Sequence, residues 1–159
     1  ASDVYKRQDN MLVQKVLSVD SNDSNILYAA LRVLSDDLSL RLKKRKQVAN
    51  IVSLGIHYSD GHSANSKGSL KFNDSQYVFD TCAKIFNKLN KRRNRVRSIL
   101  INASDFRSYL QQEYLFNNKE SSAIKISKVV DTIRSKYGLQ SIQYANILRA
   151  QKINQCLSI

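Results

Sequence analysis

The chain has 159 residues, which suits one domain of ordinary size with a tail and argues against two independent hydrophobic cores. It carries 26 Lys and Arg against 13 Asp and Glu, a formal net charge of +13, while its hydrophobic share of 42% is that of a globular protein. This balance favours a polyanionic partner, above all nucleic acid, although basic ribosomal and membrane-surface proteins share it. No apolar run approaches the ~18 residues that span a bilayer and no signal peptide opens the chain, so we expect no membrane partner and a cytoplasmic location.

The first predicted elements are a strand and a long helix. Gln14–Asp20 is rich in β-branched residues and precedes a polar cluster, Ser21–Asn25, that can cap a helix. The following segment has leucine at helical spacing, at positions 27, 31, 34, 38 and 42, and ends in the basic run Lys43–Lys46. Cations in a last turn also favour the helix dipole, so this run is open to a structural and to a binding interpretation.

The middle of the chain predicts a hairpin, a second helix and a last strand. Ile51–Tyr58 alternates, with Val52, Leu54, Ile56 and Tyr58 on one face and Ser53, Gly55 and His57 on the other. Ser66–Phe72 continues the alternation, with Leu70 and Phe72 inward. Asn73–Ser75 then caps a helix whose apolar stripe includes Cys82, and a basic stretch precedes the strand at 96–103.

This order predicts an α+β fold of the split βαββαβ, ferredoxin-like type, with both helices on one face of the sheet. The other face is uncovered, and we expect its small and cationic residues to lie against a phosphate backbone, with an ordinary solvated face as the alternative. A third helix, Ser122–Tyr137, carries an apolar stripe and is followed by an apolar stretch to Leu148, which together form a C-terminal helical extension.

Catalytic motifs are missing from the sequence. The adjacent Asp36 and Asp37 lie on the polar side of the first predicted helix and are better explained as a surface acidic pair than as a two-metal centre. Cys82 and Cys156 lie far apart, which argues against zinc and predicts a buried free thiol at Cys82. No phosphate loop, dinucleotide fingerprint, nucleophile elbow or HExxH motif occurs. We therefore assign no catalytic residue, no metal ligand and no cofactor to this chain.

Four blocks of the sequence resemble the little-finger region of Y-family translesion DNA polymerases, in particular the bacterial UmuC-like (ImpB-MucB-SamB) group. They are LRVLSDDLSLRLKKRKQVANIVSLGIHY at 31–58, SKGSLKF at 66–72, VRSILINASDF at 96–106 and IRSKYG at 133–138. The resemblance runs from about Gln14 to Leu148. It implies a βαββαβ module that lies in the DNA major groove and holds template and primer. The catalytic carboxylates of the family, and the Mg²⁺ they bind, belong to a palm domain that this chain lacks, as it lacks the fingers and thumb.

The resemblance also implies contacts to primer-template DNA. Ser66, Lys67, Ser69 and Lys71 match the outer strand that faces the template backbone, and Arg97 and Ser98 match the final strand. The family often has Arg where Ser69 stands. To these positions we add cations of the two basic runs, namely Lys43, Lys44, Arg45, Arg93 and Arg95.

A short peptide, Gln112-Glu113-Tyr114-Leu115-Phe116, resembles the QLxLF-type peptide by which these polymerases bind the sliding clamp. It departs from the pattern at Glu113, where Leu is usual. We expect Leu115 and Phe116 to enter a hydrophobic pocket of the clamp and Gln112 to hydrogen-bond at its rim. A plain loop with Leu115 and Phe116 buried in the domain is the alternative.

The predicted organisation is therefore a leader at 1–12, a DNA-binding domain at 13–106, a connector with the clamp-like peptide at 107–121, and a helix and tail at 122–159. The leading function is DNA positioning within an error-prone lesion-bypass polymerase of the SOS response. A stand-alone basic RNA-binding or ribosome-associated protein remains open, but it should show aromatic residues on the open face. A protein-interaction module would instead have an apolar open face.

Overall fold

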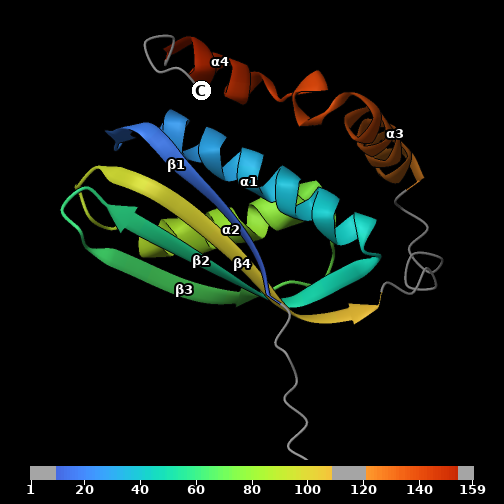
Figure 1. Cartoon of the computed structure of the whole chain (residues 1–159), viewed down its shortest axis with the longest axis horizontal. Coiled ribbons are helices and arrows are strands. Elements are labelled where there is room, and N and C mark those ends of the chain that lie inside the picture. The colour runs from blue at the N-terminus through green and yellow to red at the C-terminus, as the bar shows by residue number, and fades with distance from the viewer. Residues whose placement is uncertain (1–9, 109–120, 154–159) are drawn as a thin grey trace, which may run out of the picture.

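The computed structural model describes residues 10–108 and 121–153 and consists of a sheet with helices on one face (Figure 1). The strands are β1 (Met11–Ser21), β2 (Gln47–Tyr58), β3 (Ser63–Ser69) and β4 (Val96–Ser108). The helices are α1 (Ser24–Lys44), α2 (Ser75–Leu89), α3 (Ser121–Tyr137) and α4 (Ala145–Ile153), with a 3₁₀ turn η2 (Leu139–Ser141) before α4. The predicted α+β fold and its βαββαβ order are confirmed.

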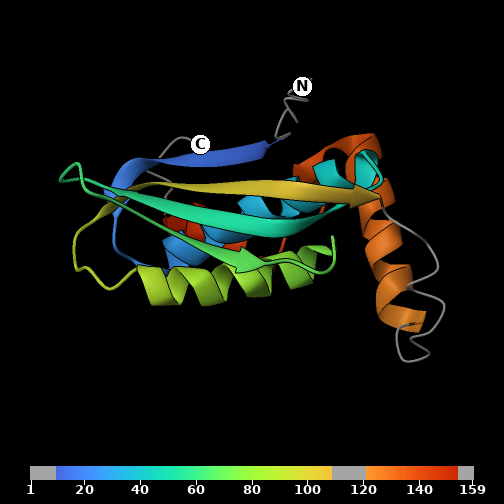
Figure 2. The same cartoon turned by 90° about the horizontal axis from the view of Figure 1, so that it is seen from below.

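The sheet is antiparallel throughout, with the strand order β1-β4-β2-β3. The central strand β4 pairs with β1 on one side and with β2 on the other, and helices α1 and α2 cover one face of the sheet (Figure 2). The leucine stripe of α1 and the alternate apolar residues of β2 and β4 meet between the layers. Val52, Leu54 and Ile56 are fully buried there, as the alternation of β2 predicts.

Side-chain caps begin both long helices where the sequence places them. The Asp23 carboxylate accepts a hydrogen bond from the backbone N–H of Asn25 at 2.8 Å. The Asp74 carboxylate accepts from the N–H groups of Gln76 and Tyr77 at 3.1 and 3.4 Å. These bonds satisfy N–H groups that have no partner inside the helix, so each helix begins at a defined residue.

Several strand boundaries differ from those predicted, including the starts of β2 at Gln47 and of β3 at Ser63. β1 begins at Met11, whose side chain is only 4% exposed, so the domain starts before residue 13. β4 continues to Ser108 because its last residues pair with Gln47 and Val48 of β2. β3 ends at Ser69; Leu70 is buried beyond it, whereas Phe72 is half-buried with its ring edge-on to Tyr77.

The C-terminal extension is packed against the domain. Ile147 and Ala150 of α4 are buried on Ala29 of α1, with Val33 beside them. The apolar stripe of α3 behaves differently, because Ile126, Val129 and Tyr137 are 65, 58 and 67% exposed. The periodicity correctly predicts the helix, but in the structure this stripe is not a buried face.

Asp36 is not the surface residue that the sequence predicts. It is 5% exposed, and Arg32 Nε and Arg134 Nη2 lie 3.5 and 3.1 Å from its carboxylate oxygens. The Ser75 hydroxyl of α2 donates a hydrogen bond to the same carboxylate. Arg134 also donates from Nε and Nη2 to the carbonyl oxygen of Ile142, at 3.2 and 3.0 Å. This buried group joins α1, α2, α3 and the segment before α4.

Two further contacts fasten the extension to the domain. The guanidinium carbon of Arg32 lies 3.5 Å from the ring centroid of Tyr144 and 4.8 Å from that of Phe79, so it makes cation–π contacts with two aromatic rings. Ser127 of α3 donates to the Asp74 carboxylate at 3.1 Å. The extension is therefore held by polar contacts at several points along its length.

Cys82 is a buried free thiol, as predicted from its place on the apolar stripe of α2. Burial raises the pKa of this thiol to about 12, with a hydrogen bond to Ser35 opposing the rise. Among the described residues, no helix is long and apolar enough to cross a membrane, and no three His, Cys, Asp or Glu residues are grouped so as to hold a metal ion.

Removing Arg134 should destabilise the protein far more than removing an exposed arginine of similar pairing. We expect Arg134→Ala to lower the free energy of unfolding by about 3 kcal/mol, because it leaves the buried Asp36 carboxylate short of a partner. Arg41 pairs with Asp37 at 2.9 Å on the surface, so Arg41→Ala should cost less than about 1 kcal/mol. Urea denaturation followed by circular dichroism measures both, and equal losses would contradict this account of the network.

Candidate nucleic-acid interface

On the uncovered face of the sheet, side chains of neighbouring strands form rows that run across the sheet. Pairing register places Val16, Ser98, His57 and Ser63 in one row. The next row is Gln14, Leu100, Gly55 and Asn65, and the one after it is Leu12, Asn102, Ser53 and Lys67. Ser104, Ile51 and Ser69 follow. Within these rows Lys67 is the one cationic residue.

This composition corrects the prediction of a small and cationic face. The half formed by β2 and β3 is polar except for Ile51, which is 38% exposed, whereas the half formed by β1 and β4 carries Leu12 and Val16, which are 55 and 60% exposed, with Leu100 between them. Leu100 lies over Gly55, since a Cβ at position 55 would come within 3.0 Å of the Leu100 side chain. The glycine thus lets a neighbouring leucine lie flat on the open face.

Two groups of exposed cations lie at the two ends of the sheet. At one end Lys44, Arg45 and Lys46 are exposed where α1 turns into β2, and Lys71 is exposed after β3. The turn is tight, with Lys46 at a φ of 52°. At the other end an exposed basic group comes from the loop between α2 and β4 and from the start of β4, namely Lys91, Arg92, Arg93, Arg95 and Arg97. The open face is therefore bordered by positive charge rather than covered by it.

Some of these cations already have acidic partners. Arg97 Nη2 lies 3.2 Å from the Asp20 carboxylate, and Arg92 Nη2 lies 2.9 Å from that of Asp60. Both pairs are exposed, so each arginine can be recruited by a phosphate at small cost. Arg93 and Arg95 have no ion-pair partner in the described part of the chain, which leaves their charge available.

Three of the residues that the sequence predicts to contact DNA are poorly placed for such a contact. Lys43 forms an ion pair with Asp131 of α3 and donates to Ser127 at 3.2 Å, so it holds the extension. Ser66 is paired with the buried Leu54 and therefore lies on the helix side of β3. Ser98 faces the open side but is only 4% exposed, with Gln14 Nε2 3.5 Å from its hydroxyl.

The other predicted positions that fall within the described residues are exposed. They are Lys44, Arg45, Lys67, Ser69, Lys71, Arg93, Arg95 and Arg97. Gln112, Leu115 and Phe116, proposed for clamp binding, lie outside the described residues.

The sequence reasoning missed both Arg134 and the apolar half of the open face. Arg134 belongs to the IRSKYG block, so the block was noticed but the buried role of its arginine was not. Leu12, Gln14 and Val16 are two positions apart and so share one face of β1, and two of the three are apolar, which indicates an outward face that is partly apolar.

The loop between β2 and β3 is fastened to the basic loop beside it. Asp60 accepts from the His62 backbone N–H at 3.1 Å and also holds Arg92 and Asn94. Tyr58 hydroxyl donates to Asn90 at 3.1 Å, and the N–H of Ser59 donates to the carbonyl oxygen of Arg95 at 2.9 Å. These bonds order the end of the sheet where the second group of cations lies.

The comparisons identify the family. Residues 9–114 match the model of the impB/mucB/samB family C-terminal domain. The chain belongs to this family. The match ends before α3, so the C-terminal extension lies beyond the part that defines the domain.

Relatives of known name agree with this assignment. The chain is 26% identical over 133 residues to DNA polymerase IV of Dehalococcoides mccartyi strain 195, covering 82% of this chain and 34% of the relative. It is 27% identical over 134 residues to the putative UV-damage repair protein UvrX of Bacillus subtilis strain 168, covering 80% of this chain and 32% of the relative. The chain thus spans about a third of the length of these relatives.

Solved structures show the same fold. The little-finger domain of PolIV, in a complex with the beta-clamp processivity factor, superimposes with a TM-score of 0.51 at 13% identity, covering 65% of this chain and 90% of that one. DinB from Sulfolobus solfataricus gives a TM-score of 0.52 at 11% identity over 61% of this chain and 28% of that one. The fold of this chain is that of a Y-family little-finger domain.

The Asp60 carboxyl should titrate below its ordinary range. The hydrogen bond from the His62 backbone is the largest cause and lowers the pKa of Asp60; burial opposes it, and Arg92 and Asn94 lower the pKa further. A depressed pKa means that the contacts of Asp60 are fully present above about pH 3.8, the unfolded value, and are lost as the pH falls further. Carboxyl ¹³C shifts of Asp60 followed by NMR should give a midpoint below 3.8, and Arg92→Ala should raise it. A midpoint at or above 3.8 contradicts the described geometry.

Proposed function

We propose that this chain holds primer-template DNA for an error-prone translesion polymerase, through contacts to the phosphate backbone. The observation that carries the proposal is the arrangement of exposed cations at both ends of an open sheet, with Lys67 between them on β3. A net charge of +13 gives the whole chain the required attraction to a polyanion.

The spacing of these cations suits duplex DNA. Strand β2 has 12 residues, so at ~3.3 Å per residue the two ends of the sheet are about 36 Å apart. One turn of B-form DNA is about 34 Å long, so cations at the two ends can reach phosphates on successive turns. The sheet between them would then lie over a groove, where its mostly uncharged surface meets sugars and base edges and Lys67 alone of the described rows reaches a phosphate.

The family assignment supports a role in DNA synthesis past damage. The relatives are polymerases and a putative UV-damage repair protein, and one similar structure is described as an insertion ternary complex of Dbh DNA polymerase. The competing role as an RNA-binding protein would need aromatic side chains for base stacking. Across the four described rows of the open face no Phe, Tyr or Trp occurs, so that role has no support.

DNA binding should depend steeply on salt and on the face from which a residue projects. If about five phosphates are engaged, the slope of log K against log salt on duplex DNA should be about −4 to −5. Lys67→Ala should reduce that slope by about 0.9, the contribution of one phosphate contact. The neighbouring Ser66→Ala is the matched control, because Ser66 lies on the opposite side of the same strand.

Fluorescence anisotropy with a labelled primer-template duplex, measured at several salt concentrations, provides both numbers. An Arg93→Ala, Arg95→Ala double variant should reduce the magnitude of the slope by more than Lys67→Ala does. It should not change thermal stability, since both side chains are exposed. A flat salt response in the parent protein, or equal losses for Lys67→Ala and Ser66→Ala, would overturn the proposed interface.

We further propose that Gln112–Phe116 binds a sliding clamp, with Leu115 and Phe116 as anchors. Support comes from the resemblance of this peptide to clamp-binding peptides and from the similarity of the domain to one described in complex with a beta-clamp. In the sequence the peptide lies between the end of β4 and the start of α3, and short binding peptides commonly occur in segments that connect two elements.

A Leu115→Ala, Phe116→Ala variant should lose clamp binding in surface plasmon resonance while it retains its melting temperature and its DNA affinity. The matched control is Ile126→Ala, Val129→Ala, which removes two exposed apolar side chains from the described part of α3. Unfolding of the first variant would show that the pair belongs to the core, and unchanged clamp binding would show that the peptide is inactive.

A further inference from the structure

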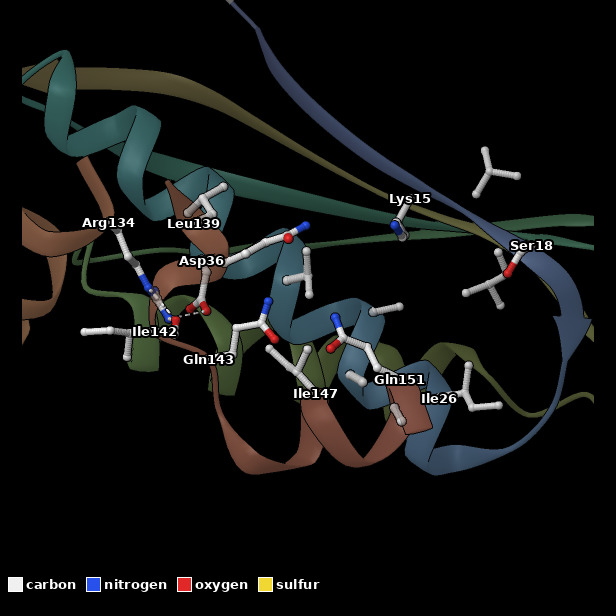
Figure 3. Close-up of a pocket in the computed structure, with 17 residues that line it drawn as sticks. Lys15, Ser18, Ile26, Asp36, Arg134, Leu139, Ile142, Gln143, Ile147 and Gln151 are labelled. Carbon is white, nitrogen blue, oxygen red and sulfur yellow. Dashed lines mark hydrogen bonds and ion pairs between the residues drawn. The ribbon is translucent and has the colours of Figure 1, made fainter. Parts of the chain in front are cut away.

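A cavity of about 340 Å³ lies between the domain and its C-terminal extension. Strand β1 forms one wall, helix α1 forms the floor, and η2, the segment after it and α4 form the other wall (Figure 3). The cavity is thus made by the docking of the extension and lies on the helix side of β1, apart from the open face proposed for DNA. Its volume is near the lower end of the roughly 300 to 1,000 Å³ range of small-ligand sites, which suits a few side chains better than a large cofactor.

The wall formed by β1 exposes a backbone edge. Four consecutive residues, Lys15, Val16, Leu17 and Ser18, line the cavity. Successive side chains of a regular strand point to opposite faces, and the pairing of β1 with β4 is irregular between Val16 and Ser21, so both side chains and the edge of the strand border the cavity here. β1 is an edge strand of the described sheet, so the N–H and C=O groups on that side have no strand partner there. Such an edge is a template for an added strand.

The floor of the cavity is deepened by small residues. Ile26, Ala29, Ala30 and Val33 stand at helical spacing on α1 and line it together. The two alanines leave room above the helix that larger side chains would fill. The other wall contributes Leu139, Ile142 and Ile147, and glutamines at 140, 143 and 151 supply amide groups. An occupant with apolar side chains and a hydrogen-bonding backbone matches this lining.

The charge of the lining is positive. Asp36 and Arg134 both border the cavity, but they pair with each other at 3.1 Å. Lys15 is the remaining charged group of the lining, and among the described residues it has no ion-pair partner. Lys15 is paired with the buried Ile99, so it projects from the helix-facing side of a free edge, where an unpaired charge discourages indiscriminate strand addition. A strand that brings a carboxylate removes this penalty.

We propose that this groove binds an extended, acidic peptide segment of another protein, which adds to the free edge of β1 and places apolar side chains over Ala29 and Ala30. A second copy of this chain is a poor occupant, because two chains of charge +13 repel each other. DNA is a poor occupant as well, because the wall and floor are mostly apolar.

A phage-displayed library of random ten-residue peptides, panned on the full 159-residue chain, tests the proposal directly. Each round is counter-selected on Val33→Phe, which fills the cavity from a half-buried position. Enriched peptides should contain alternate apolar residues and at least one Asp or Glu. In hydrogen-exchange mass spectrometry, the selected peptide should slow exchange in the segment that contains residues 15–18 and leave β3, at the opposite edge, unchanged.

Two charge reversals serve as a matched pair. Lys15→Glu should weaken binding of the selected peptide about tenfold or more, whereas Lys67→Glu, with the same change of net charge on the far edge strand, should leave it unchanged. DNA affinity should fall in Lys67→Glu and stay nearly unchanged in Lys15→Glu, so failure of this proposal and failure of the DNA interface are distinguishable. Circular dichroism confirms that the variants are folded.

Four results would overturn the proposal. The first is that no peptide prefers the parent chain to Val33→Phe. The second is that a selected peptide slows hydrogen exchange in β2 and β3 rather than in residues 15–18. The third is equal weakening by Lys15→Glu and Lys67→Glu, which would show a general attraction of acidic peptides to a basic protein. A concentration-dependent dimer in light scattering that blocks peptide binding would assign the groove to a second copy.

Discussion

The alternation of side chains along β2 and β4 is the constraint on which the rest of the structure depends. These two strands occupy the centre of the sheet, and their register sends Val52, Leu54 and Ile101 toward the helices. A shift of one residue would expose this whole set, so the register is fixed by the apolar surface it buries. The opposite face is left open as a consequence, and exposed cations gather where the strands end and the chain turns.

The buried Asp36 adds a second level of organisation. Its contacts with Arg32, Arg134 and Ser75 connect three helices, one of which lies beyond the matched domain. A desolvated carboxylate is costly unless it is paired, and this requirement ties the extension to one position on α1. That position creates the groove beside β1. The same polypeptide thus presents a polar and apolar sheet face bordered by cations, and, on another side, a narrow groove with a free strand edge.

Periodicity in the sequence was sufficient to predict which residues are buried where the pattern lies within a single helix or strand. The leucines of α1 and the alternate residues of β2 are buried as their spacing predicts. Asp36 could not be assigned in this way, because its partner Arg134 lies 98 positions later in the chain. The face on which Ser66 lies could have been predicted from the sequence. Ser66 is one position from Lys67, so the period of two along a strand places them on opposite faces. The exposure of the α3 stripe depends on how the extension docks, which spacing along one helix does not reveal.

In the proposed interface, DNA contacts the open face and the ends of the sheet rather than the helix layer. Lysine acetylation footprinting with mass spectrometry tests this claim in one experiment, because exposed lysines occur on both sides. Saturating primer-template duplex should protect Lys67, Lys71 and Lys44, while Lys84 and Lys88, which are exposed on α2, should react as in the free protein. Equal protection of both sets, or protection of the α2 lysines alone, would contradict the account.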